Sequence, residues 1–260
     1  MMPISIDSRA VVSPKAQLGD GVSVGPFTII EDDVVVGDGT KIMASAYVAN
    51  GARIGKNCVI HHGAVVSNVP QDLKFAGEQT TLEIGNGTVV REFCTLHKGT
   101  AETGKTVIGS DCLLMANAHV AHDCRVGGHC IFANVVSLAG HVTVGDWVVI
   151  GGLTPVHQFV NIGAHAMIGG GLRVTKDVPP YILAGREPLH YDGVNIIGLR
   201  RRGFSKEQIE VIENAYRILY SSGMMVSDAV RRIESELGSL PEITLITDFI
   251  KRSARGIIRS

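Results

Sequence analysis

The sequence predicts an all-β solenoid, a parallel β-helix over residues 1–178, followed by a small α-helical domain over residues 179–260. An apolar residue, nearly always aliphatic, stands at every sixth position from Ile6 to Val174 except at Asp72, Glu78 and Glu102, and glycine often follows it. A period of six is typical of β-helices and of neither an α-helix nor an ordinary strand. Each hexapeptide then forms one short strand and a turn, and three of them close a coil of 18 residues.

The cysteines give an independent test of this interpretation, because all of them occupy one position of the repeat. That position comes four residues after the repeat aliphatic and faces the interior on a strand of period two. Five buried thiols in one slot are expected to be small core residues, so we expect neither a disulfide framework nor a cysteine-rich zinc site. Free thiols also fit a reducing compartment. The five are Cys58, Cys94, Cys112, Cys124 and Cys130.

Charge and hydropathy exclude several classes of protein. The net charge is −1, which argues against a nucleic-acid-binding chain. No uninterrupted apolar run reaches the roughly 18 residues of a membrane span. The first residues lack the basic and apolar regions of a signal peptide. We therefore expect a cytoplasmic protein without membrane insertion.

The six-residue pattern ends before Pro179 and Pro180, and a helical period replaces it. Residues 205–208 read SKEQ, a capping-box pattern that opens a helix expected to run to about Ser222. Two further helices are expected, one at 227–238 and one after Pro241. A helical domain in this place would cover the edge strands that the last coil exposes.

Two interruptions, near residues 67–83 and 97–107, leave the phase of the repeat unchanged. Such insertions must project from the coil as loops, and loops on a rigid scaffold often carry function. The first contains Asp72 and Lys74, an acid and a base close together. The alternative is that they form an ordinary solvated loop tip.

Between Ile108 and Val174 no insertion occurs, so residues 18 apart must stack. His122 is then predicted to lie beneath Gly140, which lies beneath Gln158. Histidines that converge with an aspartate on one face can transfer protons, although scattered surface histidines remain the alternative. The neighbouring polar residues are His119, Asp123, His141 and His157.

Seven segments together resemble the UDP-N-acetylglucosamine O-acyltransferase family of lipid A biosynthesis. The hexapeptide repeat alone is shared by many acyltransferases, but this combination is specific and spans nearly the whole chain. The segments are NAHVAHDC at 117–124, LAGHV at 138–142, VHQF at 156–159, QDLKFAGE at 71–78, GVN at 193–195, RRRGF at 200–204 and RSARGIIR at 252–259.

The resemblance implies a left-handed parallel β-helix that assembles as a homotrimer. It implies transfer of an (R)-3-hydroxyacyl group to the 3-hydroxyl of UDP-N-acetylglucosamine, the first step of lipid A biosynthesis. The acyl donor is carried on the phosphopantetheine arm of acyl carrier protein, and no metal or other cofactor is expected. By resemblance His122 is the general base, Asp123 orients or stabilises its imidazolium, and the N–H of Gly140 is the oxyanion donor.

Other positions match substrate-binding residues of the family. Arginine suits the geometry of phosphate, and the resemblance also favours Arg201 and Arg202 in a basic patch for the acidic carrier protein. The family often has an acidic residue where this chain has Ile197, which leaves the uracil contacts open. The matching positions are Asp72, Lys74, His141 and Gln158 for the sugar, His119 and His157 for the cleft, and Asn195 and Arg202 for the nucleotide.

A further outward column contains Ala116, Asn134, Gly152 and Gly170 at 18-residue spacing. In the family the residue that matches Gly170 helps to set acyl chain length, and glycine implies room for a longer chain. The alternative is that these glycines only serve turns.

Three alternative functions explain the sequence less well. A zinc-dependent lyase of the gamma carbonic anhydrase type could use His119 and His122 as ligands, but it would not explain the C-terminal domain. A non-catalytic scaffold would need neither the loops nor the histidine column. The N-acyltransferase of the same pathway carries an additional N-terminal domain, whereas the repeats here begin at Ile6.

Overall fold

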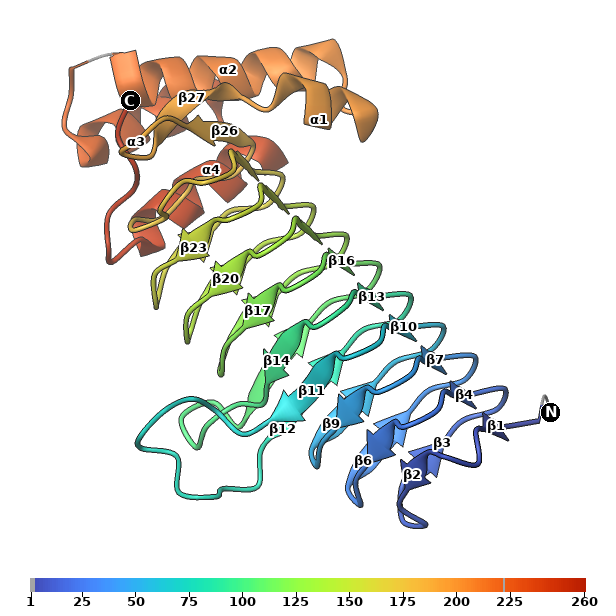
Figure 1. Cartoon of the computed structure of the whole chain (residues 1–260). Coiled ribbons are helices and arrows are strands. Elements are labelled where there is room, and N and C mark those ends of the chain that lie inside the picture. The colour runs from blue at the N-terminus through green and yellow to red at the C-terminus, as the bar shows by residue number, and fades with distance from the viewer. Residues whose placement is uncertain (1–2, 222) are drawn as a thin grey trace.

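The computed structural model describes residues 3–221 and 223–260, and it confirms the parallel β-helix. Successive short strands pass in turn to three parallel sheets, so that the chain advances as a stack of triangular coils (Figure 1). Strands three apart in the chain are hydrogen-bonded neighbours, and in uninterrupted coils their register is 18 residues, as in His119↔Ser137 and Ser137↔Pro155.

The bounds of the strands follow, sheet by sheet. The first sheet contains β1 (Ser5–Ile6), β4 (Ser23–Val24), β7 (Lys41–Ile42), β10 (Val59–Ile60), β13 (Val89–Val90), β16 (Leu113–Leu114), β19 (Ile131–Phe132), β22 (Val149–Ile150), β25 (Met167–Ile168), β26 (Ile182–Gly185) and β27 (His190–Val194). The second sheet contains β2 (Val11–Val12), β5 (Ile29–Ile30), β8 (Tyr47–Val48), β11 (Val65–Asn68), β14 (Thr95–His97), β17 (His119–Val120), β20 (Ser137–Leu138) and β23 (Pro155–Val156). The third sheet contains β3 (Gln17–Leu18), β6 (Val34–Val36), β9 (Ala52–Ile54), β12 (Thr81–Ile84), β15 (Lys105–Ile108), β18 (Arg125–Val126), β21 (Thr143–Val144) and β24 (Asn161–Ile162).

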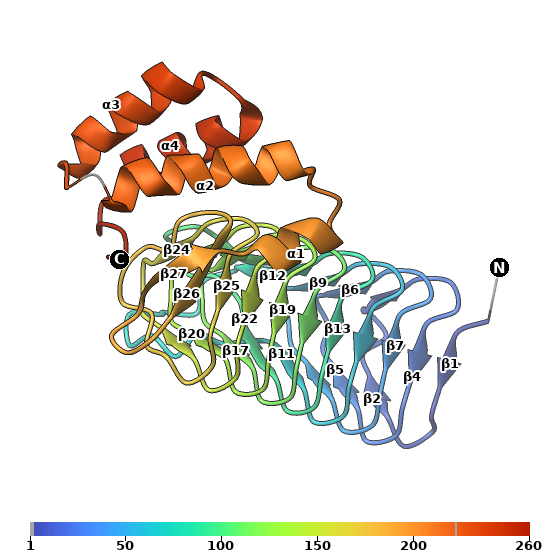
Figure 2. The same ribbon diagram turned by 90° about the horizontal axis from the view of Figure 1, so that it is seen from above.

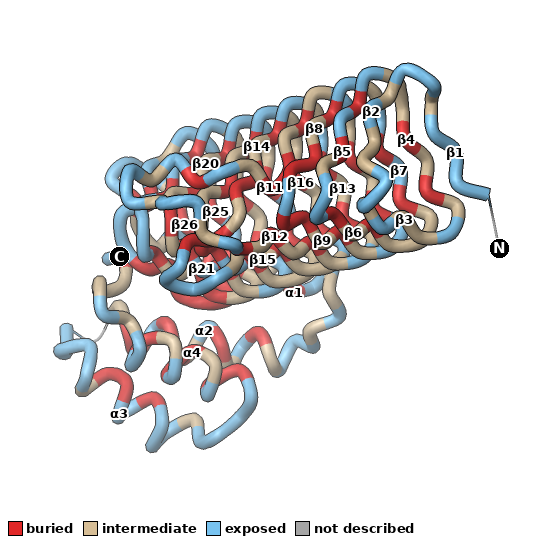
Figure 3. Tube along the Cα trace, turned by 90° about the horizontal axis from the view of Figure 1, so that it is seen from below, coloured by how far each residue is buried: buried red, intermediate tan, exposed pale blue. Residues whose placement is uncertain are grey.

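The core is the column of repeat aliphatics inside the coils (Figure 3). Val120, Leu138 and Val156 are nearly inaccessible and stack on one another through their paired strands. Burying each such side chain contributes about 1.5–3 kcal/mol relative to exposure. All five cysteines are free and buried among these residues, as their shared position predicted.

The two insertions leave this stack where the repeat fails. The first connects β11 to β12 and projects away from the coils (Figure 1). The second connects β14 to β15 and is shorter. On the far side of both, β12 and β15 pair over four residues, so the ladder continues without a change of face.

The part beyond residue 178 is not wholly helical, which corrects the expectation for 179–260. β26 pairs in parallel with β25, and β27 folds back on β26 in antiparallel fashion. This hairpin extends the first sheet because an open final strand would leave its N–H and C=O groups unpaired. Its Ile182 and Ala184 are fully buried.

In the described part of the chain, four helices follow the hairpin and pack over one side of the C-terminal coils (Figure 2). The expected capping box is present, since Ser205 and Gln208 exchange hydrogen bonds of 2.9 and 3.2 Å. The expected helix end at Ser222 lies outside the described residues. Within the described ranges, no helix is both long and apolar enough for a bilayer span. The helices are α1 (Ile196–Arg201), α2 (Lys206–Ser221), α3 (Val226–Leu237) and α4 (Pro241–Arg252).

Candidate active site

The predicted histidine column lies along the corner between the second and third sheets. Asp123, His141 and Phe159 take the same left-handed backbone conformation there, with φ of 61, 63 and 64°. The turns are tied together by bonds from His141 N to His122 O (3.1 Å) and from Phe159 N to Gly140 O (3.2 Å). The 18-residue spacing thus places successive corners directly above one another.

The imidazole of His122 lies against the backbone of Gly140. A Cβ added to Gly140 would be 2.6 Å from His122 Cε1 and 2.7 Å from Nε2, which is closer than side chains approach one another. Glycine is therefore required here for the close approach itself, since its φ is not in the left-handed region. Among the described residues the N–H of Gly140 donates to no protein acceptor.

His122 is oriented by a buried carboxylate. Its Nδ1 lies 2.7 Å from Asp123 Oδ2, and the Asp123 side chain is inaccessible to solvent. Burial alone would raise the pKa of Asp123, but hydrogen bonds from Thr103, His122 and Thr100 outweigh it and hold the pKa at about 2. The carboxylate is ionised at neutral pH and can only accept, so in the neutral imidazole the hydrogen of His122 is on Nδ1 and Nε2 keeps its lone pair.

Thr100 and Thr103, which the sequence patterns did not indicate, hold the carboxylate of this pair by hydrogen bonds. Asp123 Oδ1 accepts from the Thr100 N–H (3.0 Å) and from the Thr103 hydroxyl, and Oδ2 accepts from the Thr100 hydroxyl (2.8 Å). Both belong to the second insertion, so that insertion holds the acid beside the base. The signal for this in the sequence was that the phase of the hexapeptide repeat is unchanged across the insertion.

His141 joins His122 at the same corner. Their rings meet edge to face at 5.1 Å, and the His141 ring stacks on Phe159 at 4.5 Å. His141 Nε2 is 3.5 Å from a Glu102 carboxylate oxygen and 3.7 Å from Asp123 Oδ2. The ring is thus held by packing more than by hydrogen bonds.

His119, which is half-buried, brings a buried histidine, His97, to the cluster. The two rings meet edge to face at 5.0 Å, and His119 Nδ1 is 2.7 Å from the Thr95 hydroxyl. His97 is 2% exposed and its Nδ1 has no partner among the described residues. Burial, aided by His119 and His122, lowers the pKa of His97 to about 4, and burial also lowers that of His119. Both rings are neutral at pH 7.

The same corner has the geometry of a possible metal site, because His122, Asp123 and His141 offer ligand atoms within 4.8 Å of one another. The donor set fits a metal poorly. All four acceptor positions of Asp123 are already taken by Thr100, Thr103 and His122. The arrangement suits an acid–base pair better.

Asp72 and Lys74 lie in the first insertion, which leaves the coils between β11 and β12 at this same corner. The Lys74 N–H donates to Asp72 Oδ1 (3.0 Å), which shapes the loop tip, and Leu73 between them is fully exposed. Within the described ranges no hydrogen bond or ion pair links either side chain to the histidines.

Asn195 and Arg202 lie at a different corner, between the third and first sheets. Arg202 sits 5.4 Å above the Trp147 ring beside a cavity of about 910 Å³ that Arg201 and Ile197 also line. Arg202 Nη1 is buried with no hydrogen-bond partner among the described residues, so it is a donor that an anion could satisfy. Asn195 is instead the N-cap of α1, with Oδ1 accepting from Gly198 N and Nδ2 donating to His165 O.

The small-residue column forms the remaining corner, between the first and second sheets. A Cβ on Gly170 would lie 3.0 Å from Gly152 O, and one on Gly152 would lie 3.0 Å from Asn134 O, so these residues stack as predicted. The residues predicted for catalysis, for the nucleotide and for the acyl chain therefore occupy three different corners of one chain.

Known proteins resemble this chain in both sequence and fold. The family profile described as UDP-N-acetylglucosamine O-acyltransferase, domain 2, matches residues 177–258, and the bacterial transferase hexapeptide profile matches 33–68 and 105–136. The chain is 49% identical to LpxA, a UDP-N-acetylglucosamine acyltransferase from Bacteroides fragilis, with a TM-score of 0.96 over 97% of this chain and 99% of that one.

Two further solved structures are similar over the whole length. LpxA from Acinetobacter baumannii is 46% identical, with a TM-score of 0.95 over 98% of this chain and 99% of that one. The Arabidopsis UDP-N-acetylglucosamine acyltransferase is 37% identical, with a TM-score of 0.88 over 98% of this chain and 100% of that one. Similarity at this level covers the coils, both insertions and the helices.

Proposed function

Since the chain belongs to the UDP-N-acetylglucosamine acyltransferase family and is an acyltransferase, we propose that it moves an (R)-3-hydroxyacyl group from acyl carrier protein to the 3-hydroxyl of UDP-N-acetylglucosamine. The observation that carries this proposal is the His122–Asp123 pair beneath the N–H of Gly140, which has no acceptor among the residues that the structure describes. A base with a free lone pair beside an oxyanion donor is what attack of a hydroxyl on a thioester requires.

In the proposed reaction His122 Nε2 takes the proton of the sugar hydroxyl as its oxygen attacks the thioester carbonyl. The resulting oxyanion accepts a hydrogen bond from the Gly140 N–H. Collapse of the intermediate forms the ester and expels the phosphopantetheine thiolate, which recovers the proton from the imidazolium. The buried Asp123 carboxylate stabilises the imidazolium while it exists.

We propose that the step uses no metal or other cofactor. The support is the donor set, because binding of a cation by Asp123 would have to displace Thr100 or Thr103. Turnover should therefore survive exhaustive treatment with a chelator. Loss of turnover that added zinc restores would contradict this part of the proposal.

Substrate binding is proposed to involve more than one copy of the chain. The residues matched to nucleotide and acyl group lie on other corners than His122, and within the described residues no hydrogen bond or ion pair links Asp72 or Lys74 to the histidines. A homotrimer would allow the loop of one copy to meet the histidine corner of another. Asp72, Lys74, His141 and Gln158 would then bind the sugar.

For the nucleotide we propose Arg202, whose unpartnered Nη1 suits a phosphate oxygen, and Asn195 beside it. Arg201 is exposed at the same cavity and is proposed to help dock the acidic carrier protein. His119 and His157 are proposed as further polar residues of the cleft. The reaction is proposed to be the first step of lipid A biosynthesis in the cytoplasm, where five free thiols are stable.

The test is a product analysis. Purified protein is incubated with UDP-N-acetylglucosamine and 3-hydroxyacyl carrier proteins of several chain lengths, and the product is identified by mass spectrometry and NMR. We expect one acyl ester, on the 3-oxygen of the sugar. Absence of any acylated nucleotide sugar, or acylation at another position, would contradict the proposal.

A further inference from the structure

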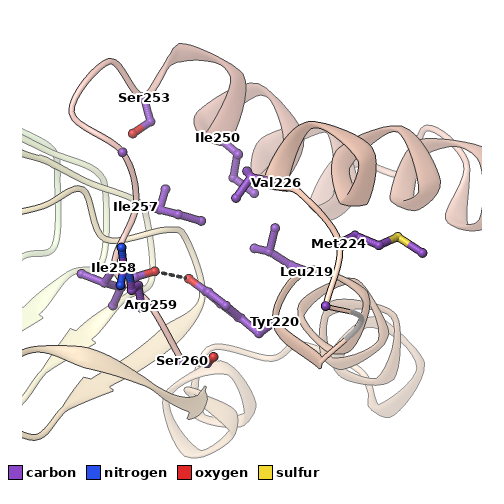
Figure 4. Close-up of a pocket in the computed structure, with 12 residues that line it drawn as sticks. Leu219, Tyr220, Met224, Val226, Ile250, Ser253, Ile257, Ile258, Arg259 and Ser260 are labelled. Atoms are coloured by element: carbon purple, nitrogen blue, oxygen red, sulfur yellow. Dashed lines mark hydrogen bonds between the residues drawn. The ribbon is translucent and has the colours of Figure 1, made fainter.

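The last residues of the chain return from the helices to the coils. This C-terminal tail (residues 253–259) is held by the backbone of Asp177. The Asp177 N–H donates to Gly256 O (3.1 Å), and the Asp177 carbonyl accepts from the Ile258 N–H (2.9 Å). The fully buried Asp177 carboxylate also accepts from the Ser253 hydroxyl at 2.7 Å. On the helical side, the Tyr220 hydroxyl donates to Ile258 O at 3.0 Å (Figure 4). The tail is therefore fixed from both sides.

Arg255 extends from this tail to the corner that carries two of the proposed cleft residues. Its Nη1 donates to Thr175 O (3.3 Å), and its Nη2 donates to Gln158 O (3.0 Å) and lies 3.2 Å from His157 Nδ1. These contacts join residues 80 to 98 positions apart in the chain. They are the means by which the tail touches the corner one coil above Gly140.

The contact with His157 has a consequence for its proton. An arginine NH₂ group has two hydrogens and no acceptor, so it can donate one to Gln158 O and one to His157 Nδ1. Nδ1 also lies 3.1 Å from Gln158 O, which could accept a hydrogen from it, but that hydrogen would then lie beside a guanidinium only 3.2 Å away. The positive charge of Arg255 therefore favours an acceptor Nδ1, with the hydrogen on Nε2, over an Nδ1–H that donates to Gln158 O. Among the described residues Arg255 is the one titratable group in contact with this ring.

We infer that Arg255 is a positioning residue of the site, which fixes the tautomer of His157 and the backbone of Gln158 from the C-terminal tail. His157 is thereby left with Nε2–H as a defined donor. The carbonyl of Gln158 is held by Arg255, which fixes the backbone from which the Gln158 side chain extends. The inference rests on the proposed function only in placing these two residues in the acyltransfer cleft, because the tautomer can be measured without turnover.

The first experiment is ¹⁵N NMR of histidine-labelled protein, with His157 assigned by its absence in His157→Gln. In the wild type we expect an acceptor-type Nδ1 and a protonated Nε2. In Arg255→Gln the two nitrogen shifts should converge as both tautomers become populated. Arg255→Lys, which keeps a cationic donor, should stay closer to the wild type. A wild-type His157 protonated on Nδ1 would overturn the inference.

The second experiment separates positioning from docking of the carrier protein. Arg255→Gln should lower kcat about tenfold with the KM for acyl carrier protein unchanged, because misplacing site groups by a fraction of an ångström costs up to about 10². The same substitution should cost much less in a His157→Gln background. The inverse pattern, a raised KM for the carrier protein with full kcat and unchanged His157 shifts, would make Arg255 a docking residue.

Arg259→Gln is the matched control, since it lies in the same tail and its side chain makes no hydrogen bond or ion pair within the described residues. It should keep wild-type kcat and wild-type His157 shifts. Equal losses in Arg255→Gln and Arg259→Gln would indicate general loosening of the tail and overturn the assigned role. If the wild type proves inactive with the proposed substrates, the NMR result still decides the inference.

Discussion

A single methyl group added at Gly140 should disable the base without removing the oxyanion donor. In Gly140→Ala the new Cβ would lie 2.6 Å from His122 Cε1 and 2.7 Å from Nε2. Carbon atoms pack at about 3.5–4.0 Å, so the imidazole must move by about 1 Å. A displacement of that size costs about 10²-fold, or roughly 2.7 kcal/mol of transition-state stabilisation. The variant keeps the backbone N–H at this position, and its φ needs no left-handed conformation.

The assay is kcat with both substrates saturating, together with a thermal unfolding midpoint to confirm the fold. Gly128→Ala is the control, because that glycine occupies another corner, has no positive φ, and would bring its Cβ no closer than 3.3 Å to Ser110 O. We expect near-normal turnover there. Comparable turnover in Gly140→Ala would refute the argument that glycine is required for the approach of His122.

A double substitution identifies the cause. If the added methyl group acts by displacing His122, adding Gly140→Ala to His122→Ala should cost less than about threefold. If the losses in kcat of the two single variants instead multiply in the double variant, the effect of Gly140→Ala comes from the oxyanion donor.

Three other perturbations test separate parts of the account. Arg202→Ala and Arg202→Gln should each raise the KM for UDP-N-acetylglucosamine about 10- to 100-fold, because a charge-assisted hydrogen bond contributes about 1.5–3 kcal/mol. An unchanged KM for the nucleotide sugar, with a raised KM for the carrier protein, would assign Arg202 to the docking surface. Gly170→Met should shift preference to shorter acyl chains at about 0.8 kcal/mol per refused methylene, and uniform slowing of all lengths would indicate coil distortion instead. Folding lowers the pKa of His97 from 6.5 to about 4, so His97 binds a proton more readily in the unfolded chain. The free energy of unfolding should therefore fall by about 3 kcal/mol on acidification from pH 7 through pH 4. Unfolding midpoints of His97→Gln should show a smaller loss over that range, and an undiminished loss would show that other groups cause it.

The coil and the proposed catalytic pair could be predicted from the sequence because both follow from one period. An interior residue every six positions determines the strands, and an uninterrupted stretch of 18-residue coils places Gly140 over His122. The capping box of α2 was likewise visible, since capping depends on residues three apart. Local patterns of this kind need no knowledge of the rest of the fold.

The parts that were not predicted depend on contacts without a period. Thr100 and Thr103 lie in an insertion, where no repeat indicates that their hydroxyls face Asp123. The β26–β27 hairpin forms because the final coil offers an edge to pair with, and its own segment carries no hexapeptide signal. The contact of Arg255 with Gln158 joins residues 97 apart and needs the path of the tail to be known.

The most direct test of the central claim is the single-turnover rate of acyl transfer in wild type and His122→Ala, with enzyme in excess and both substrates bound. Single turnover measures the chemical step apart from product release. We expect a loss on the order of 10² to 10⁴ in the variant, with an unchanged unfolding midpoint. A variant rate within about threefold of wild type would show that His122 is not the base.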